Sequence, residues 1–168
     1  MMGKSDYLGS LGAEAIGARL RRLSERIDRD AGRVYAALGV RFEQRWFGVL
    51  NQLHLHETQT VSDIARTLRI SHVSVSQARK SLEGAGYIAS LPNKNDARSK
   101  EIRLTNKGRH LVEMASPVWV ALNATAIALA GEVDGLVDAL DRLDNSLDRR
   151  PFYDRALCAL NIEASSIS

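Results

Sequence analysis

Cysteine, proline and aromatic residues are scarce in this sequence of 168 residues, which holds one cysteine, three prolines and 5% aromatics. The single cysteine, Cys158, excludes an intramolecular disulfide, and this agrees with a reducing compartment. So few prolines and aromatics argue against an all-β fold and against a low-complexity chain. The hydrophobic content of 45% and the charged content of 26% are ordinary for a globular protein that buries a core.

Long hydrophobic runs are also missing. The N-terminal segment MMGKSDYLGSLGAEAIG contains no apolar run of the length that a signal peptide needs. The most apolar stretch, residues 118–130, is shorter than a membrane span and contains Asn123 and Thr125. We therefore expect a cytoplasmic protein that does not enter a membrane.

The sequence lacks the motifs of common enzyme classes. It contains no G-x-S-x-G motif, no P-loop and no Rossmann fingerprint. His54 and His56 are two residues apart, so they do not share a helix face, and the ligand spacing of a zinc site is missing. We therefore expect no catalytic residues, no metal and no cofactor, although an unrecognised small-molecule enzyme stays as an alternative.

Positive charge is concentrated in the middle of the chain. Residues 61–110 hold ten basic and four acidic residues, whereas residues 111–168 hold four basic and nine acidic residues. The net charge of the whole chain is only +3. A compact basic segment is typical of a protein that contacts nucleic acid, and a plain solvated face is the alternative.

Helical periodicity covers the N-terminal part of the chain. Residues 10–38 predict one helix that ends before Gly39, with apolar positions that include Leu20, Leu23 and Ile27. Such a helix is about 43 Å long, too long to pack fully against one small domain. We therefore expect part of it to contact a partner chain.

A helix-turn-helix follows. Residues 41–55 predict a helix, Thr60 and Asp63 form a capping box for a short helix over 61–69, and Ser71 caps a helix over 72–84. Two short helices joined by a tight connection are typical of this motif. Its second helix, with Val75, Ala78 and Leu82 as the buried stripe, is the candidate recognition helix (residues 71–84).

A β-hairpin and further helices complete the pattern. Residues 87–91 and 100–104 alternate as strands around a polar loop, which makes residues 87–104 a wing after the helix-turn-helix. Helices are predicted over 106–130, capped by Thr105 and disturbed by Pro117, and over 132–147 and 151–162. The expected fold is mainly α with a small β-hairpin wing, a winged helix-turn-helix (41–105) flanked by long dimerisation helices (1–40 and 106–168).

Residues 61–108 carry a set of motifs in one order. The motifs are Ile64-Ala65…Leu68, Ile70-Ser71, Leu82-Glu83-Gly84-Ala85-Gly86-Tyr87-Ile88, Asp96-x-Arg98, Leu104-Thr105 and Gly108. This set resembles the winged-helix core of the multiple-antibiotic-resistance regulator (MarR) family. Two positions depart from the family pattern, and both remove positive charge. Ser90 stands where a basic residue is common. Ala97 stands where the common Asp-Arg-Arg pattern of the wing has its first arginine.

The resemblance implies a homodimer whose N- and C-terminal helices interlock. It also implies a regulator, often a repressor, whose DNA affinity changes when a ligand binds. Two reading heads about 34–36 Å apart on a two-fold axis predict an inverted-repeat site in double-stranded DNA. An architectural DNA-binding protein without ligand sensing is the alternative that the sequence leaves open.

The exposed side of the recognition helix supplies the candidate DNA contacts. Gln77 is the favoured base reader, because an amide pairs with adenine at two positions, whereas Arg79 and Lys80 are expected at the phosphates. Arg98 is expected in the minor groove, with Asp96 holding its guanidinium. The full sets are Ser71, His72, Ser74, Ser76, Gln77, Arg79 and Lys80 on the helix, and Asn93, Lys94, Asn95, Asp96 and Arg98 in the wing.

A ligand pocket between the helical region and the winged helix is a further possibility that the resemblance implies. The candidate residues are Arg45, Trp46, His54 and Trp119, with Phe47 as another wall. For the aromatic residues the competing interpretation is an ordinary core, and for Arg45 and His54 it is an exposed pair.

The single cysteine, Cys158, has two interpretations. It is either an inert cysteine or a redox switch.

Overall fold

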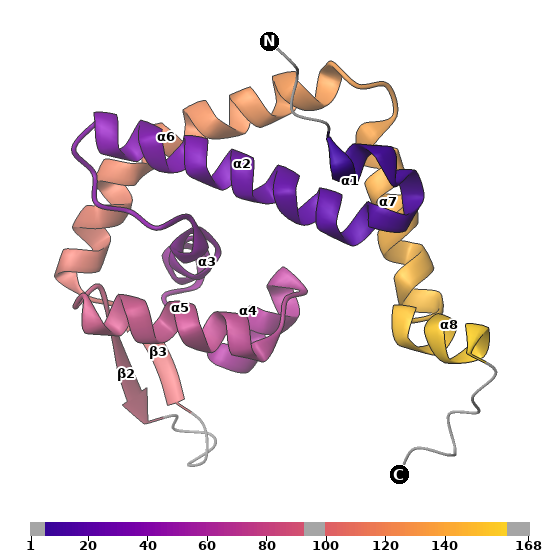
Figure 1. Cartoon of the computed structure of the whole chain (residues 1–168). Helices are drawn as coiled ribbons and strands as arrows, with labels where there is room; N and C mark the ends of the chain where they lie inside the picture. Colours follow the sequence, from indigo (N-terminus) through magenta and orange to yellow (C-terminus); the bar gives the residue numbers. More distant parts are fainter. Residues whose placement is uncertain (1–5, 93–99, 161–168) are drawn as a thin grey trace. The chain divides into compact units, whose positions relative to one another are not determined.

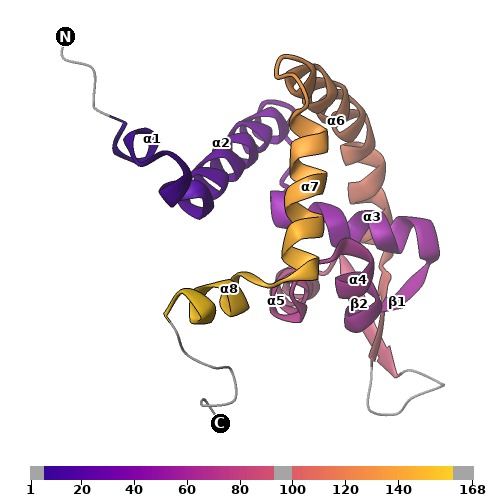
Figure 2. The same ribbon diagram turned by 90° about the vertical axis from the view of Figure 1, so that its right-hand side faces the viewer.

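The computed structural model of the chain, shown in Figure 1 and Figure 2, describes residues 6–92 and 100–160. The chain divides into two compact units, residues 1–120 and residues 121–168, and each unit is described by itself. The first unit contains three strands and the helices up to the middle of α6. The second unit contains the end of α6 followed by two shorter helices.

The first unit begins with three helical segments instead of one. They are α1 (Tyr7–Ser10), the 3₁₀ helix η1 (Gly12–Ala15) and α2 (Ile16–Ala37). Gly12, the first residue of η1, has a φ of +57°, which a regular helix does not contain, so the helix is interrupted between α1 and η1. The expectation of one helix from residue 10 is therefore wrong at its start, whereas its end before Gly39, which has a φ of +69°, is confirmed.

The helix-turn-helix is preceded by the 3₁₀ helix η2 (Gln44–Trp46) and by α3 (Phe47–His56). Residues 40–43 are not helical, so the helix predicted over 41–55 starts too early. The helix-turn-helix consists of α4 (Val61–Leu68) and α5 (His72–Gly84). The bounds of α5 agree with the prediction from the sequence, and Figure 1 shows α4 and α5 below α3 in the first unit.

A three-stranded antiparallel sheet in the order β1-β3-β2 forms the wing and its base (Figure 2). Its strands are β1 (Thr58–Thr60), β2 (Ile88–Pro92) and β3 (Lys100–Leu104). In the hairpin, Pro92 lies opposite Lys100 and Ser90 lies opposite Ile102. The hairpin was predicted, but β1 was not, because its three residues show no apolar alternation.

Helix α6 (Asn106–Gly131) begins directly against the winged helix. The hydroxyl of Thr105 accepts a hydrogen bond from the backbone N–H of Gly108 at 3.0 Å and donates to the carbonyl of Gly86 at 2.8 Å. A Cβ atom on Gly108 would lie 2.0 Å from the carbonyl oxygen of Tyr87, so the close approach requires glycine. The expected cap at Thr105 is confirmed.

The core of the first unit lies between α3, α5, the sheet and the first half of α6. Its most deeply buried side chains include Leu50, Ile64, Leu82 and Ile102. By length and composition alone α6 is apolar enough to cross a membrane, with a mean hydropathy of 1.4 over an 18-residue window. Its first half nevertheless packs into this core, where the buried residues are Leu111, Val112, Ala115, Val118 and Trp119.

The second unit continues from the end of α6 into α7 (Leu136–Arg149) and α8 (Phe152–Ala159). Gly135 has a φ of +68° and precedes α7, so this helix starts later than the predicted residue 132. The side chain of Arg155 in α8 donates to the carbonyl of Ser146 in α7 at 2.8 Å. This contact fastens α8 to the last turn of α7.

Replacing Gly108 by alanine is expected to destabilise the first unit. The new Cβ would overlap the carbonyl oxygen of Tyr87, so the backbone must shift, at a cost of about 1–3 kcal/mol. Gly84→Ala is the matched control, because a Cβ at the end of α5 meets no atom within 4 Å. Denaturant unfolding checks both variants, and equal midpoints for Gly108→Ala and the parent protein would contradict the close approach.

Candidate nucleic-acid interface

Side-chain caps fix the start of both helices in the helix-turn-helix. At α4, the backbone N–H of Asp63 donates to the Thr60 hydroxyl at 3.1 Å, and that hydroxyl donates to Asp63 Oδ2 at 2.7 Å. At α5, the backbone N–H of Ser74 donates to the Ser71 hydroxyl at 3.1 Å. Both caps predicted from the sequence are confirmed, and each replaces a hydrogen bond that the first helical turn lacks.

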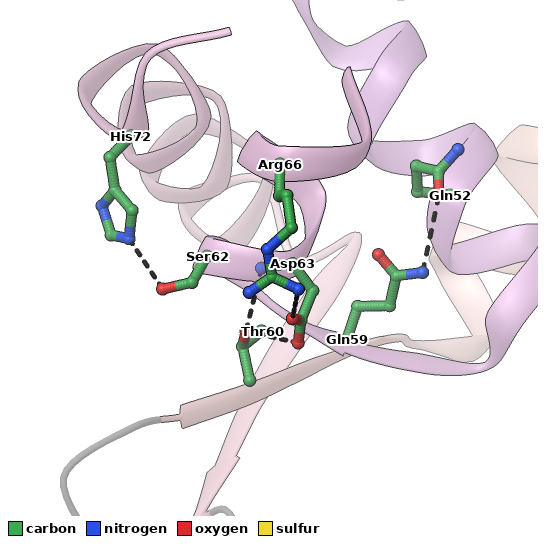
Figure 3. Close-up of polar contacts among 7 residues, drawn as sticks. All are labelled: Gln52, Gln59, Thr60, Ser62, Asp63, Arg66 and His72. Carbon is green, nitrogen blue, oxygen red and sulfur yellow. Dashed lines mark hydrogen bonds and ion pairs between the residues drawn. The ribbon is translucent and has the colours of Figure 1, made fainter. Parts of the chain in front are cut away.

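The same contacts lower the pKa of Asp63 below its ordinary value. The main cause is the hydrogen bond from the Thr60 hydroxyl to the carboxylate, and Arg66, whose guanidinium lies 3.0 Å from Asp63 Oδ1, adds to it (Figure 3). Burial acts in the opposite direction. The ionised carboxylate is thus part of the cap of α4.

Helix α5 has one buried and one exposed side. Val75, Ala78 and Leu82 are at most 2% exposed, which confirms the predicted stripe. Five of the seven predicted contact residues on this helix are exposed, Ser76 is half-buried, and Arg79 is treated separately below. The exposed five are Ser71, His72, Ser74, Gln77 and Lys80.

Three of the five exposed side chains form polar contacts at the start of α5. His72 Nε2 lies 3.0 Å from the hydroxyl of Ser62 on α4, a contact that Figure 3 shows. The hydroxyls of Ser71 and Ser74 lie 2.8 Å apart. Gln77 and Lys80 have no hydrogen-bond or ion-pair partner within the described part of the chain, so their polar groups are available to a ligand.

Arg79 is engaged inside the protein. Its guanidinium donates to Glu83 Oε2 and to the hydroxyl of Ser90, both at 3.0 Å, and its side chain is 23% exposed. These contacts tie α5 to strand β2. The i, i+4 spacing of Arg79 and Glu83 is visible in the sequence, but the contact with Ser90 depends on the fold. Arg79 therefore holds the wing against α5 and is poorly placed to reach a phosphate.

The described part of the wing ends at Pro92 and resumes at Lys100. The predicted contact residues of its tip, Asn93, Lys94, Asn95, Asp96 and Arg98, lie outside the described residues.

One exposed side chain on α5 was missed by the sequence prediction. Val73 is 65% exposed between His72 and Ser74. Its signal in the sequence is an apolar residue that does not follow the stripe of Val75, Ala78 and Leu82.

The candidate ligand residues fall into two places. Trp46 and Trp119 both lie edge-on to Phe42, with ring centroids 6.0 Å away in each case, and both are buried. The neighbouring Arg45 forms an ion pair with Glu43. His54 instead lines a separate cavity of about 410 Å³ with Leu53, Glu57, Thr58, Arg103, Leu104 and Arg109.

The aromatic cluster of Tyr35, Phe42, Trp46 and Trp119 contains two buried polar atoms that form no hydrogen bond of regular geometry within the described part of the chain. These are the hydroxyl of Tyr35 and Nε1 of Trp119, whereas Nε1 of Trp46 donates to the Ser81 hydroxyl at 3.1 Å. Burial raises the pKa of the Tyr35 hydroxyl above its ordinary value, and the Trp119 side chain, as a hydrogen-bond partner, acts in the opposite direction. The two polar atoms thus lie near each other, in a contact whose geometry falls short of a regular hydrogen bond.

Cys158 is exposed on α8. Within residues 6–92 and 100–160, no cluster of three His, Cys, Asp or Glu side chains has the placement of a metal site.

Comparisons with known proteins give one consistent family. Residues 39–99 match the model of the MarR family. Over 120 residues the chain is 29% identical to a protein of Rhodopseudomonas palustris named transcriptional activatory protein BadR. That match covers 70% of this chain and 64% of the relative, so it spans less than two thirds of the relative's length.

Solved structures show the same fold. The transcriptional regulator MosR of M. tuberculosis in complex with DNA aligns with a TM-score of 0.65 and 21% identity, over 79% of this chain and 95% of MosR. The S. aureus MepR–DNA complex gives 0.65 and 23%, over 78% and 97%. A mutant of E. coli MarR with operator DNA gives 0.61 and 20%, over 85% and 99%. The predicted fold class, a mainly helical protein with a winged helix, is confirmed.

Replacing Asp63 by asparagine is expected to destabilise the protein at pH 7, and the deficit should shrink below about pH 4. The folded-state pKa of Asp63 is lowered, so its contribution is present above the unfolded-state pKa and is lost as the pH falls through the folded-state pKa. Urea unfolding at several pH values measures the difference. The control Asp28→Asn removes an exposed carboxylate from α2 and should leave the stability at pH 7 unchanged; a pH-independent deficit for Asp63→Asn would refute the account.

Proposed function

We propose that the chain, whose residues 39–99 match the model of the MarR family, is a transcriptional regulator that binds double-stranded DNA with α5 in the major groove. The observation that carries this proposal is the exposed face of α5, where Gln77 and Lys80 have no polar partner among residues 6–92 and 100–160, on a helix whose other face is buried. The basic charge of residues 61–110 supplies the attraction to phosphate.

The contacts divide by chemistry. The Gln77 amide reads a base edge, and Lys80 contacts the phosphate backbone. The capped start of α5 also presents free backbone N–H groups to a phosphate. In the wing, Arg98 enters the minor groove with Asp96 orienting it, since arginine favours the negative potential there.

The protein acts as a homodimer on an inverted repeat. Helix α2 exposes an apolar stripe whose spacing follows helical periodicity, and an exposed stripe of this kind is unfavourable in water unless another surface covers it. Its members are Ile16, Leu20, Leu23, Ile27, Val34 and Leu38, all between 37% and 61% exposed. Helix α7 likewise exposes Val137, Leu140 and Leu147. A two-fold dimer places two copies of α5 on successive major grooves.

The regulator is a cytoplasmic repressor whose DNA affinity changes when a small effector binds. The Tyr35 hydroxyl and Trp119 Nε1, which form no hydrogen bond of regular geometry within the described residues, would offer polar contacts to an effector in the aromatic cluster, beside Trp46 and Arg45. The relative BadR is named an activatory protein, so an activator is the second candidate for the direction of control. Transcript levels of neighbouring genes after deletion of the gene separate the two.

Selection from a random duplex library, followed by gel shifts over a range of salt concentrations, tests the function. A selected inverted repeat bound with a steep salt dependence supports the regulator. Salt-dependent binding without a preferred sequence supports an architectural protein instead. The absence of DNA binding at every salt concentration, together with turnover of a small molecule, would favour an enzyme.

Replacing Gln77 by alanine is expected to relax the base preference at one position in each half-site, with a loss of about 1–3 kcal/mol for the selected site. Repeating the selection with the variant measures this. Asn145→Ala, which removes an exposed amide from α7, is the control and should leave the preference unchanged. An unaltered preference for Gln77→Ala would remove this residue from the base contacts.

Size-exclusion chromatography is expected to give a mass about twice the 18.5 kDa of the chain. Ile27→Gln, in the exposed stripe of α2, should shift the protein toward the monomer and weaken DNA binding, because two linked heads bind more tightly than one. The neighbouring Asp28→Gln lies off the stripe and should leave the dimer intact. A stable monomer of the parent protein at micromolar concentration would contradict the dimer.

A further inference from the structure

Val73 is an apolar side chain on the polar exposed face of α5. It occupies the second position of the helix and is 65% exposed, so it contributes little to the core. Valine is also a weaker helix former than alanine, because its branched Cβ loses rotamer freedom against the preceding turn. Neither core packing nor helix propensity accounts for an apolar residue at this position.

The nearby Ile70 has a structural explanation that Val73 lacks. Ile70 is 46% exposed and directly precedes the cap residue Ser71, while the buried Val75 lies at the fourth helical position. These are the two positions of a hydrophobic staple, which sets the angle at which the chain enters a helix. Val73 belongs to neither position.

Val73 lies between two residues whose side chains form polar contacts at the start of α5. His72 before it contacts Ser62 on α4 at 3.0 Å, and Ser74 after it contacts Ser71 at 2.8 Å. Val73 also shares a helix face with Gln77 and Lys80, at spacings of four and seven residues. It therefore extends the proposed reading face toward the N-terminus, the end of a recognition helix that contacts base edges.

The chemistry of the major groove determines what such a side chain can recognise. Base edges there present hydrogen-bond donors and acceptors, and the apolar group among them is the 5-methyl group of thymine. We propose that Val73 is a specificity-determining residue that selects a thymine by packing against this methyl group, an inference that rests on the proposed DNA-binding function.

The position of this thymine follows from the helix geometry. Val73 and Gln77 are one helical turn apart, about 5.4 Å, and base pairs are spaced about 3.4 Å along each strand. The thymine therefore lies within about two base pairs of the pair that Gln77 reads.

Deoxyuridine substitution tests this contact, because deoxyuridine differs from thymidine only by the missing methyl group. In one half-site of the selected sequence, each thymine is replaced in turn and affinity is measured by fluorescence anisotropy. The parent protein should lose about fourfold in affinity at one thymine near the Gln77 pair, the value for about 0.8 kcal/mol of lost methyl burial. In Val73→Ser the ratio at this thymine should fall to about one, whereas Val73→Ile should keep it.

Leu55→Ser is the matched control, because Leu55 is 61% exposed on α3 and lies outside α5; the ratio at every thymine should match that of the parent protein. Serine is tolerated in the first turn of a helix, and circular dichroism verifies that Val73→Ser is folded. Sequence-specific binding in which no thymine depends on the residue at position 73 would overturn this inference alone. A failure of the parent protein to bind any sequence specifically would overturn the proposed function, and this inference with it.

Discussion

The burial of one side of α5 is the constraint on which the rest of the interface depends. Val75, Ala78 and Leu82 are enclosed by the core of the first unit, and Ile64 of α4 is fully buried in the same core. Since successive residues of a helix are about 100° apart, burying these three positions fixes which residues point outward. Val73, Gln77 and Lys80 are exposed for this reason. The exposed face of the helix is thus a consequence of apolar packing.

Polar contacts then hold this helix relative to its neighbours. Thr60 and Ser71 cap α4 and α5, while Trp46 reaches Ser81 on the buried edge of α5. The Arg79 guanidinium connects α5 to Ser90 of β2. Ser90 stands where a basic residue is common in the family that the sequence resembles, and here its hydroxyl accepts a hydrogen bond from Arg79 of α5 instead of adding charge to the wing. A hydrogen bond therefore links α5 to β2 at the base of the wing.

Local patterns in the sequence predicted α5 and β3 with correct bounds, because the cap residue Ser71 and a helical apolar period mark α5, and the alternation of Ile102 and Leu104 marks β3. Strand β1 escaped prediction, since three polar residues acquire strand geometry only by pairing with β3. Arg79 was expected at a phosphate, but its guanidinium donates to Ser90 instead. The sequence does not reveal this contact, since only the fold brings the two residues together. Similarly, His54 and Trp119 were grouped as one pocket, but His54 lines a cavity that Trp119 does not line, and Trp119 is buried among aromatic side chains.

The central claim is that α5 reads DNA from the major groove, and chemical substitution of the bases tests it most directly. Replacing purine N7 atoms by carbon in one half-site removes major-groove acceptors, and replacing guanine by inosine removes a minor-groove donor. Fluorescence anisotropy with the selected duplex measures both effects. The account predicts that N7 replacement at the base pairs facing α5 weakens binding by about 1–3 kcal/mol, more than tenfold in the middle of that range. Equal affinity for the N7-substituted and natural duplexes would contradict it.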